Sequence, residues 1–291
     1  PYTTYMDKTT FDSFMEQTEG TYAGIGIVVM NDVKDNTVLI SYVYDGCPGD
    51  KAGIQAGDKI IKVNGEDVFG EDLTNATSKM KGKEGTNVKL SIYRQSDDSN
   101  FDAELVREII EIPTVEHKTV AGDIGYIRIT NFERVTYNQF INAYDELMGK
   151  QVSGLIIDVR NNPGGLLDVV SNIADVLIPE GNVVYTEDKN GNRQYYESDS
   201  NEINVPLVIL VNENSASASE VLSGAVKDTG KGLLVGQKTY GKGLVQNLFK
   251  LSDGSAVKVT IAKYYTPNGI CIDGEGIVPD YVVDIDEELL P

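Results

Sequence analysis

The sequence holds very few of the side chains on which disulfide frameworks, metal centres and histidine-based catalysis depend. Its 291 residues include two cysteines, Cys47 and Cys271, and a single histidine, His117. The two cysteines lie far apart in the chain and in different predicted domains, so they supply neither a disulfide framework nor a metal site. Any Ser-His-Asp arrangement is limited to one candidate base.

Basic residues and long apolar runs are also scarce. Lys and Arg number 25 against 45 Asp and Glu, a formal charge of −20. This balance disfavours nucleic acid and anionic membrane surfaces as partners, because both reward basic patches, and we attribute the acidity to solubility. The longest apolar runs, such as VPLVILV, reach about seven residues and are far too short to span a membrane. The chain begins at Pro1 without a methionine or a signal-peptide pattern, which leaves a preceding leader or membrane anchor open.

Residues 22–108 have the pattern of a β-rich domain. The stretches GIGIVVM, TVLISYVY and NVKLSIYR are typical of strands, and DKAGIQAGDKIIKVNG combines a small-residue helical turn, a Gly-Asp corner and a strand ending in an Asn-Gly turn. Together they resemble a PDZ domain, a module that binds peptide C-termini by strand addition. The resemblance puts the carboxylate-binding loop at Gly24, Ile25, Gly26 and Ile27. Without the downstream signature, these glycines are equally well explained as easing a strand past its neighbour.

Residues 109–291 alternate between strands and helices. GLIIDVR and VPLVILV are apolar enough for strands buried on both faces. Apolar residues from Phe140 to Met148 recur at helical spacing, and Thr136 and Gln139 are spaced as a capping box at the start of that helix. We therefore predict an α/β (α+β) core with an inserted β-rich PDZ domain, entered through residues 1–21.

The stretch NENSASASE, from Asn212 to Glu220, follows a strand-like run and opens a helix that the apolar spacing predicts from about Ser217 to Lys227. Ser217 and Glu220 are spaced as a capping box, which alone explains both residues. The same position suits a nucleophile, because a helix N-terminus offers free N–H groups and positive potential to an oxyanion. Spacing alone leaves both interpretations open.

A serine nucleophile needs a base, and the sequence offers two candidates. His117 lies near the domain junction and is typical of an ordinary surface or strand residue, whereas Lys242 lies between two glycines that let another backbone approach. An unperturbed lysine has a pKa of about 10.4, so a lysine base requires burial that lowers this value by roughly 3 units. The sequence cannot show that burial.

Two stretches imitate other sites. GQKTYGKG has the spacing of a P-loop but ends in glycine where magnesium needs Ser or Thr, and a strand pattern follows it instead of a helix. DKNGNRQYYESD imitates a calcium loop, but its glycine is at the fourth position and not the sixth. We predict a hairpin around Asn190 and Gly191.

Taken in order, the PDZ pattern, DVRNNPGG, NSASASE, TYGKGLVQ and YYTPNG…GEGIVPD resemble the carboxyl-terminal processing proteases, also called tail-specific proteases. The resemblance covers nearly the whole chain. It implies that Ser217 is the nucleophile, Lys242 the general base and Gln246 the residue that orients the lysine. On a straight strand the Cα atoms of Lys242 and Gln246 would lie ~13 Å apart, so contact requires a bend at Gly243.

The resemblance also implies an oxyanion hole and a structural role for Glu220. The hole combines the N–H of Ala218 with that of a glycine in the NNPGG turn, for which Gly164 is the first choice and Gly165 the alternative. Glu220 is expected to cap the helix and contact the lysine. Ser215 and Ser219, the serines on either side of the nucleophile, are expected to be small chiefly so that the turn packs closely.

The resemblance implies a serine endopeptidase that acts through an acyl-enzyme outside the cytoplasm, without metal or cofactor. The PDZ domain would select protein substrates by their C-terminal residues and gate access to the dyad. Arg94, near the end of a PDZ strand, is expected to be a solvated arginine, with a role in carrying that signal as the alternative. A homo-oligomer stays open. The rival hypothesis is a catalytically inactive, protease-like PDZ adaptor that binds peptide C-termini.

Overall fold

The computed structural model describes residues 2–68, 70 and 72–283, which form two compact units. The core unit comprises Pro1–Gly20 and Pro113–Pro291, and the small unit comprises Thr21–Ile112. The sequence analysis places the borders of the small domain between residues 21 and 22 and between residues 108 and 109, whereas the structure places them between residues 20 and 21 and between residues 112 and 113. The second divide falls later because strand β9 (Glu108–Glu111) pairs with β2 (Thr21–Gly24) inside the small unit.

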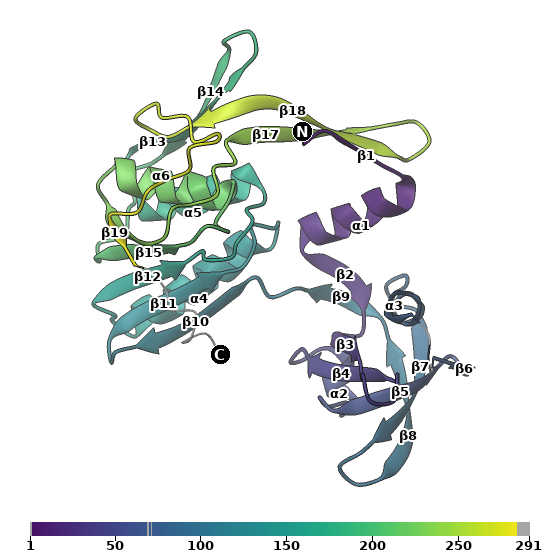
Figure 1. Ribbon diagram of the computed structural model, residues 1–291. Helices are drawn as coiled ribbons and strands as arrows, with labels where there is room; N and C mark the ends of the chain where they lie inside the picture. The colour runs from purple at the N-terminus through teal and green to yellow at the C-terminus, as the bar shows by residue number, and fades with distance from the viewer. Residues whose placement is uncertain (1, 69, 71, 284–291) are drawn as a thin grey trace. The chain divides into compact units, whose positions relative to one another are not determined.

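A six-stranded sheet forms the base of the core unit (Figure 1). The two apolar stretches GLIIDVR and VPLVILV supply its neighbouring parallel strands β12 and β15. Leu155, Ile157 and Ile209 are fully buried, whereas their strand neighbours Ile156 and Val208 are partly buried. All pairs are parallel except that between β10 and β11. In spatial order the strands are β10 (Val115–Val120), β11 (Ile124–Ile129), β12 (Gly154–Asp158), β15 (Leu207–Val211), β16 (Gly232–Gly236) and β19 (Tyr281–Val282).

Helices α5 (Leu167–Leu177) and α6 (Ala218–Asp228) lie between this sheet and a second, antiparallel sheet (Figure 1). One apolar cluster joins the helices to both sheets. The predicted hairpin around Asn190 forms the turn between two strands of the second sheet. That sheet consists of β1 (Thr4–Met6), β13 (Gly181–Asp188), β14 (Arg193–Ser198), β17 (Leu244–Lys250) and β18 (Ala256–Tyr265).

Helix α4 (Thr136–Gly149) packs on β10 and β11, and its start differs from the sequence prediction. Val135 is the N-cap residue and makes no side-chain cap, so the predicted capping box is wrong. The Gln139 amide oxygen instead accepts from the N–H of Thr114 at 2.8 Å, and the Thr136 hydroxyl pairs with that of Thr114 at 2.7 Å. Contacts with Thr114, which is distant in sequence, thus replace the local hydrogen bonds of a capping box.

The N-terminal segment belongs to the core unit rather than to the small unit it leads into. Its strand β1 pairs with β18, and helix α1 (Lys8–Glu19) follows. Asp7 caps this helix by accepting from the N–H of Thr10 at 2.8 Å, and Gly20 ends it with a positive φ of 69°. None of the helices formed by the described residues is long and apolar enough to cross a membrane.

The small unit has its own apolar core inside a six-stranded antiparallel sheet. Arg94 binds the buried Asp58 through both carboxylate oxygens and also donates to the carbonyl of Gly53, so the expectation of a solvated arginine is wrong. Its elements are β3 (Ile27–Asn31), β4 (Val38–Val43), α2 (Pro48–Lys51), β5 (Asp58–Val63), β6 (Glu66–Asp67), α3 (Leu73–Met80), β7 (Asn87–Arg94) and β8 (Ser99–Val106).

Candidate functional site

The candidate site lies where three neighbouring parallel strands of the core unit end. The loop after β12 carries Gly164, the loop after β15 carries Ser217, and the loop after β16 carries Lys242. The carboxyl ends of parallel strands meet at one edge of a sheet, which is the usual place for a site in an open α/β sheet. Sheet topology therefore brings together segments that are remote in sequence.

Ser217 occupies a sharp turn immediately before α6. Its backbone angles, φ 56° and ψ −113°, fall outside the regions that side chains other than glycine prefer. A strained strand-to-helix turn of this kind holds the side chain clear of the helix, as a nucleophile requires. The N–H of Ser217 donates to Glu220 at 2.9 Å, whereas its hydroxyl shares a 2.6 Å hydrogen bond with the hydroxyl of Tyr264. The hydroxyl thus has a partner across the site.

One cavity of about 330 Å³ connects most of the predicted site residues. Ser217, Lys242 and Gln246 line it together with Gly164 and Gly165. Helix α1 lines another side through Phe14, Gln17 and Thr18. The N-terminal segment is therefore part of the wall of the site.

The environment of Lys242 shifts the pKa of its ammonium group in the direction that a lysine base requires. Its side chain is half-buried, and burial lowers the pKa of the ammonium group. The positive charge of Lys258 lowers this pKa further, and the carboxylate of Glu220 acts in the opposite direction. The ammonium nitrogen lies 5.4 Å from the ring centroid of Tyr2.

Gln246 lies on β17, next to an irregularity in the strand between Val245 and itself. Its side-chain amide donates to the carbonyl oxygen of Tyr2 at 2.6 Å. Within the described residues, Ser217, Lys242 and Gln246 thus share a cavity without hydrogen bonds to one another. Tyr2 and Tyr264 are the groups that contact them.

Glu220 joins the serine turn to the lysine loop. Its carboxylate is fully buried and accepts four hydrogen bonds of 2.6–2.9 Å. The donors are the N–H of Ser217, the hydroxyl of Thr239, and the N–H groups of Gly241 and Lys242. Its contact with the lysine is therefore made through the lysine backbone, and the carboxylate fixes both loops at once.

Gly164 lies directly against the nucleophile turn. A Cβ atom at this position would come within 2.7 Å of the Cβ of Ser217 and 2.9 Å of the nitrogen of Ala218, so only glycine fits. The N–H of Gly164 donates to the side-chain oxygen of Asn162 at 2.8 Å. The N–H of Gly164 therefore lies near that of Ala218, its predicted partner in the oxyanion hole, but it is hydrogen-bonded to Asn162. Gly165 packs against the carbonyl of Phe132.

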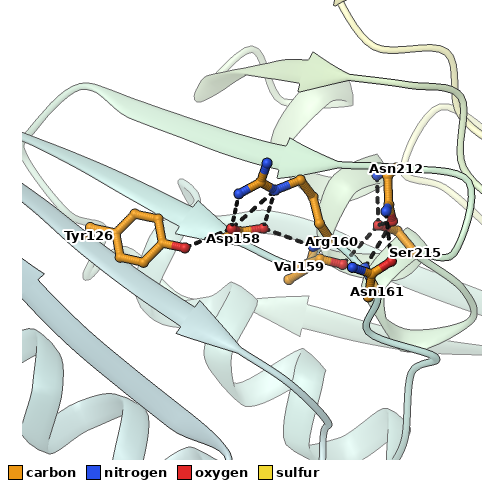
Figure 2. Close-up of polar contacts among 7 residues, drawn as sticks. All are labelled: Tyr126, Asp158, Val159, Arg160, Asn161, Asn212 and Ser215. Atoms are coloured by element: carbon orange, nitrogen blue, oxygen red, sulfur yellow. Dashed lines mark hydrogen bonds and ion pairs between the residues drawn. The ribbon is translucent and has the colours of Figure 1, made fainter. Parts of the chain in front are cut away.

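Two asparagines clamp the loop that carries Gly164 to the loop that carries Ser217 (Figure 2). The side-chain oxygen of Asn212 accepts from the N–H of Asn161 at 2.9 Å, and the Asn212 amide donates to the side-chain oxygen of Asn161 at 2.8 Å. Asn161 has a positive φ of 60°, which asparagine tolerates better than most residues. The reciprocal amide pair fixes the spacing of the two loops.

A second polar cluster anchors the end of β12 (Figure 2). The buried carboxylate of Asp158 accepts from the guanidinium of Arg160, with a shortest distance of 2.6 Å, and from the hydroxyl of Tyr126 at 2.7 Å. Although burial opposes it, these hydrogen bonds hold the pKa of Asp158 below its ordinary value. The strand end is fixed just before the glycine turn.

The serines that flank Ser217 have separate partners. The Ser215 hydroxyl donates to the carbonyl of Val159 at 2.8 Å, and the Ser219 hydroxyl donates to the carbonyl of Asn162 at 3.0 Å. Both side chains are fully buried. Their hydroxyls therefore hold the turn to the neighbouring loop, beyond the close packing that the sequence analysis expected of them.

The rival base lies elsewhere. His117 is on β10, and its Nε2 atom pairs with the carboxylate of Glu146 at 3.0 Å. It does not line the cavity that contains Ser217.

Sequence reasoning missed the residues that support the predicted groups. Tyr264 stands in the quoted YYTPNG motif, and Asn161 and Asn162 in NNPGG, yet the sequence analysis assigned none of these three residues a contact with the serine turn. The usable signal was the pair of adjacent asparagines before Pro163, since asparagine favours left-handed turns whose side chains bind backbone groups.

The small unit has an apolar groove of about 290 Å³. Gly24, Ile25 and Ile27 line it, with Met80 of α3 opposite, whereas Gly26 packs against Cys47. Strand β3 lies at the end of the strand order, so in the described part of the chain its outer edge is unpaired beside this groove. An unpaired edge next to an apolar groove is the geometry that strand addition uses.

Comparison with known proteins gives consistent matches. A family model described as peptidase family S41 matches residues 123–283, and one described as a PDZ domain matches residues 39–94. The carboxy-terminal processing protease CtpA of Bacillus subtilis is 37% identical over 287 residues, which cover 98% of this chain and 61% of that protein. The carboxyl-terminal-processing protease of Synechocystis is 35% identical over 289 residues, covering 98% of this chain and 68% of that protein.

A solved structure described as a photosystem II D1 C-terminal processing protease is also similar. Its sequence is 35% identical, the TM-score is 0.59, and the match covers 98% of this chain and 78% of that one. The present chain spans 61% and 68% of the two curated relatives named above.

Proposed function

The chain belongs to peptidase family S41, and we propose that it is a serine endopeptidase with Ser217 as nucleophile, Lys242 as general base and Gln246 as the residue that orients the lysine. One observation carries the proposal. A serine held in a strained turn at a helix N-terminus shares a cavity with a half-buried lysine whose pKa is lowered. A serine that served only as a cap would not need that lysine.

The proposed reaction follows from these groups. Neutral Lys242 takes the hydroxyl proton of Ser217 as the serine oxygen bonds to the peptide carbonyl carbon, and the carbonyl electron pair moves to its oxygen. The N–H of Ala218 and that of Gly164 donate to this oxyanion. The C–N bond then breaks as the oxyanion electron pair returns to re-form the carbonyl, and the leaving amine takes the proton from Lys242. In the second half, Lys242 takes a proton from water as the water oxygen bonds to the ester carbon, and the C–O bond to Ser217 breaks as the serine oxygen regains that proton.

Three contacts must change before this reaction can begin. Lys242 and Gln246 contact Tyr2, and the N–H of Gly164 is bound to Asn162. Proton transfer requires the lysine nitrogen within hydrogen-bonding distance of Ser217, and the oxyanion requires the Gly164 N–H in place of the asparagine oxygen. We infer that the described arrangement corresponds to a resting enzyme.

Substrates are proposed to be proteins or peptides selected through their C-termini. The unpaired edge of β3, the groove beside it and the match to a PDZ domain support this selection. Relatives named as carboxy-terminal processing proteases support the same class of substrate. We further propose a place of action outside the cytoplasm. The inactive adaptor remains the alternative, but the presence of both Ser217 and Lys242 in one cavity favours the enzyme.

Labelling with a fluorophosphonate tests the proposal. This probe phosphonylates an activated serine and leaves an ordinary helix-capping serine untouched. We expect one covalent adduct, on Ser217, found by mass spectrometry of tryptic peptides, and none in Ser217→Ala or Lys242→Ala. An unlabelled wild-type chain that still binds a C-terminal peptide would establish the adaptor instead.

A further inference from the structure

The proposed mechanism leaves one group of the site without a role. Tyr264, near the end of β18, is 4% exposed, and its hydroxyl lies 2.6 Å from the hydroxyl oxygen of Ser217. Its ring belongs to the apolar cluster of the core unit, so the side chain has little freedom to turn away. A buried tyrosine hydroxyl requires a hydrogen-bond partner, and here the described partner is the proposed nucleophile.

The backbone of Tyr264 is tied to the lysine loop. Its N–H donates to the carbonyl of Gly243, the residue after Lys242, at 3.0 Å. An added Cβ on Gly243 would come within 2.4 Å of the nitrogen of Asp273, so the loop is held on its other side as well. The backbone hydrogen bond to Gly243 therefore fixes Tyr264 relative to the loop that carries Lys242.

The phenol of Tyr264 keeps its proton at any pH at which a lysine base works. Burial raises the pKa of Tyr264 to about 12, against the opposing effect of the hydrogen bond with Ser217. A neutral phenol can donate one hydrogen bond and cannot act as the base. This excludes Tyr264 as a replacement for Lys242.

We propose that Tyr264 is a further catalytic residue, whose hydroxyl donates a hydrogen bond to the Ser217 oxygen while that oxygen attacks the carbonyl carbon and again while it leaves. The assignment rests on the proposed function. A donor from Tyr264 satisfies the serine oxygen without using the serine proton, which stays available for Lys242. If the serine donated to Tyr264 instead, its proton would point away from the base and the contact would act as a latch.

The donor matters most when the serine oxygen carries charge. As the O–H bond of Ser217 breaks and its proton passes to the lysine nitrogen, negative charge develops on the serine oxygen until the C–O bond forms. In deacylation the C–O bond breaks, the electron pair returns to that oxygen, and the proton comes back from the lysine. Tyr264 neither gains nor loses a proton in either step. Hydrogen bonds to charged oxygens are stronger than those to neutral ones, so the donor stabilises the transition state more than the resting site.

Tyr264→Phe tests the proposal, with Tyr265→Phe as a matched control. Tyr265 is the next residue of the same strand, and it does not line the cavity. Its ring stacks on that of Tyr185, with 5.0 Å between the ring centroids. We expect Tyr264→Phe to lower kcat and the rate of fluorophosphonate labelling by about 10- to 100-fold, with KM nearly unchanged. The pH at which activity rises should stay where it is, because Lys242 remains the titrating group. Tyr265→Phe should match the wild type.

Each outcome decides one question. Equal rates for Tyr264→Phe and wild type overturn the role of Tyr264 and leave the Ser-Lys dyad standing, and a faster variant identifies a latch. A wild-type chain that neither cleaves peptides nor reacts with the probe overturns the proposed function and the catalytic assignment with it.

A double-mutant cycle on thermal stability tests the hydrogen bond independently of activity. Ser217→Ala and Tyr264→Phe each leave one buried hydroxyl without its partner, whereas the double variant removes both. We expect the double variant to melt at a higher temperature than the sum of the two single effects predicts. Additive losses would show that the two hydroxyls are not coupled and would overturn the proposal.

Discussion

The groove of the small unit and the cavity of the core unit have similar volumes and very different chemistry. The groove, about 290 Å³, is lined mainly by apolar and aromatic side chains beside the edge of β3. The cavity, about 330 Å³, is lined by many polar side chains, among them a serine, two lysines, two glutamines, a glutamate and a tyrosine.

The difference reflects how each site is built. The groove can use backbone groups that any extended peptide pairs with, so its specificity depends on a few apolar contacts. The cavity depends on polar groups from three strand ends, and these stay in place only because buried groups such as Glu220 and Asn212 hold the loops. Changes in the groove should therefore alter affinity, and changes in the cavity should alter rate.

Ser217→Ala should give the largest effect. We expect peptide hydrolysis to fall by a factor on the order of 10⁴ or more in a protein that still folds, because the serine turn keeps its backbone hydrogen bond to Glu220. The buried Tyr264 hydroxyl loses its partner, which should cost about 1–3 kcal/mol of stability. Ser219→Ala serves as the matched control. Its hydroxyl binds Asn162, so it should lose about 1 kcal/mol of stability and keep substantial activity. A Ser217→Ala protein that cleaves at near wild-type rate would end the nucleophile hypothesis.

Lys242→Arg should come second. A guanidinium group does not lose its proton at working pH, so the variant keeps the charge and loses the base. We expect less than a few per cent of wild-type kcat, roughly a hundredfold loss or more, in a normally folded protein. Steady-state assays with a reporter peptide measure this, and Lys250→Arg, on the exposed part of β17, is the control. Activity well above that level would require another base.

Glu220→Gln should disturb the cavity by weakening the hydrogen bonds that hold the serine turn and the lysine loop in place. The amide replaces one acceptor oxygen with an NH₂ group that faces backbone donors, which should lower stability by about 1–3 kcal/mol. Because both loops shift, kcat should also fall between about 10- and 100-fold. Calorimetry and steady-state kinetics check both effects. Glu213→Gln, an exposed glutamate in the same segment, should change neither, and an unaffected Glu220→Gln would show that the four hydrogen bonds do not position the site.

Changes in the groove should act on affinity. Thr77 lines the groove from α3, whereas Ser78 on the same helix is exposed outside it. Thr77→Glu should raise KM for peptides with a free apolar C-terminus by about 3- to 10-fold through repulsion of the carboxylate, and Ser78→Glu should not. Amidating the peptide C-terminus should weaken cleavage to a similar extent. Equal KM values for free and amidated peptides would argue against selection by the C-terminus.

Lys258→Gln should give the smallest and most specific effect. The charge of Lys258 lowers the pKa of Lys242, so its removal raises that pKa and shifts the rise of activity to higher pH. Activity should fall about 2- to 5-fold near neutral pH and recover in alkaline solution, where Lys242 is neutral in both proteins. Lys250→Gln provides the control, and pH–rate profiles of kcat/KM measure the shift. An unchanged profile would mean that Lys258 does not influence the base.

The sequence by itself determined many of the elements and the candidate reacting groups. Continuous apolar runs identified the parallel strands β12 and β15, and the helical spacing of apolar residues identified the helix that begins after Ser217. Both patterns are local in the sequence. Motif spacing selected Ser217 and Lys242 as candidates. It also produced the capping box of Thr136 and Gln139, which failed because Thr114 offers both side chains a better partner from a distant part of the chain.

Only the tertiary structure decided the burial and the contacts of these groups. Half-burial by surrounding elements lowers the pKa of Lys242. The hydrogen bonds between Ser217 and Tyr264 and between Asn161 and Asn212 likewise join residues from different strands or loops. No local pattern encodes such pairs, because they depend on which strand ends meet when the sheet assembles. The sequence thus supplied the candidate groups, and the packing of the core unit decided their burial, the direction of their pKa shifts and their hydrogen-bond partners.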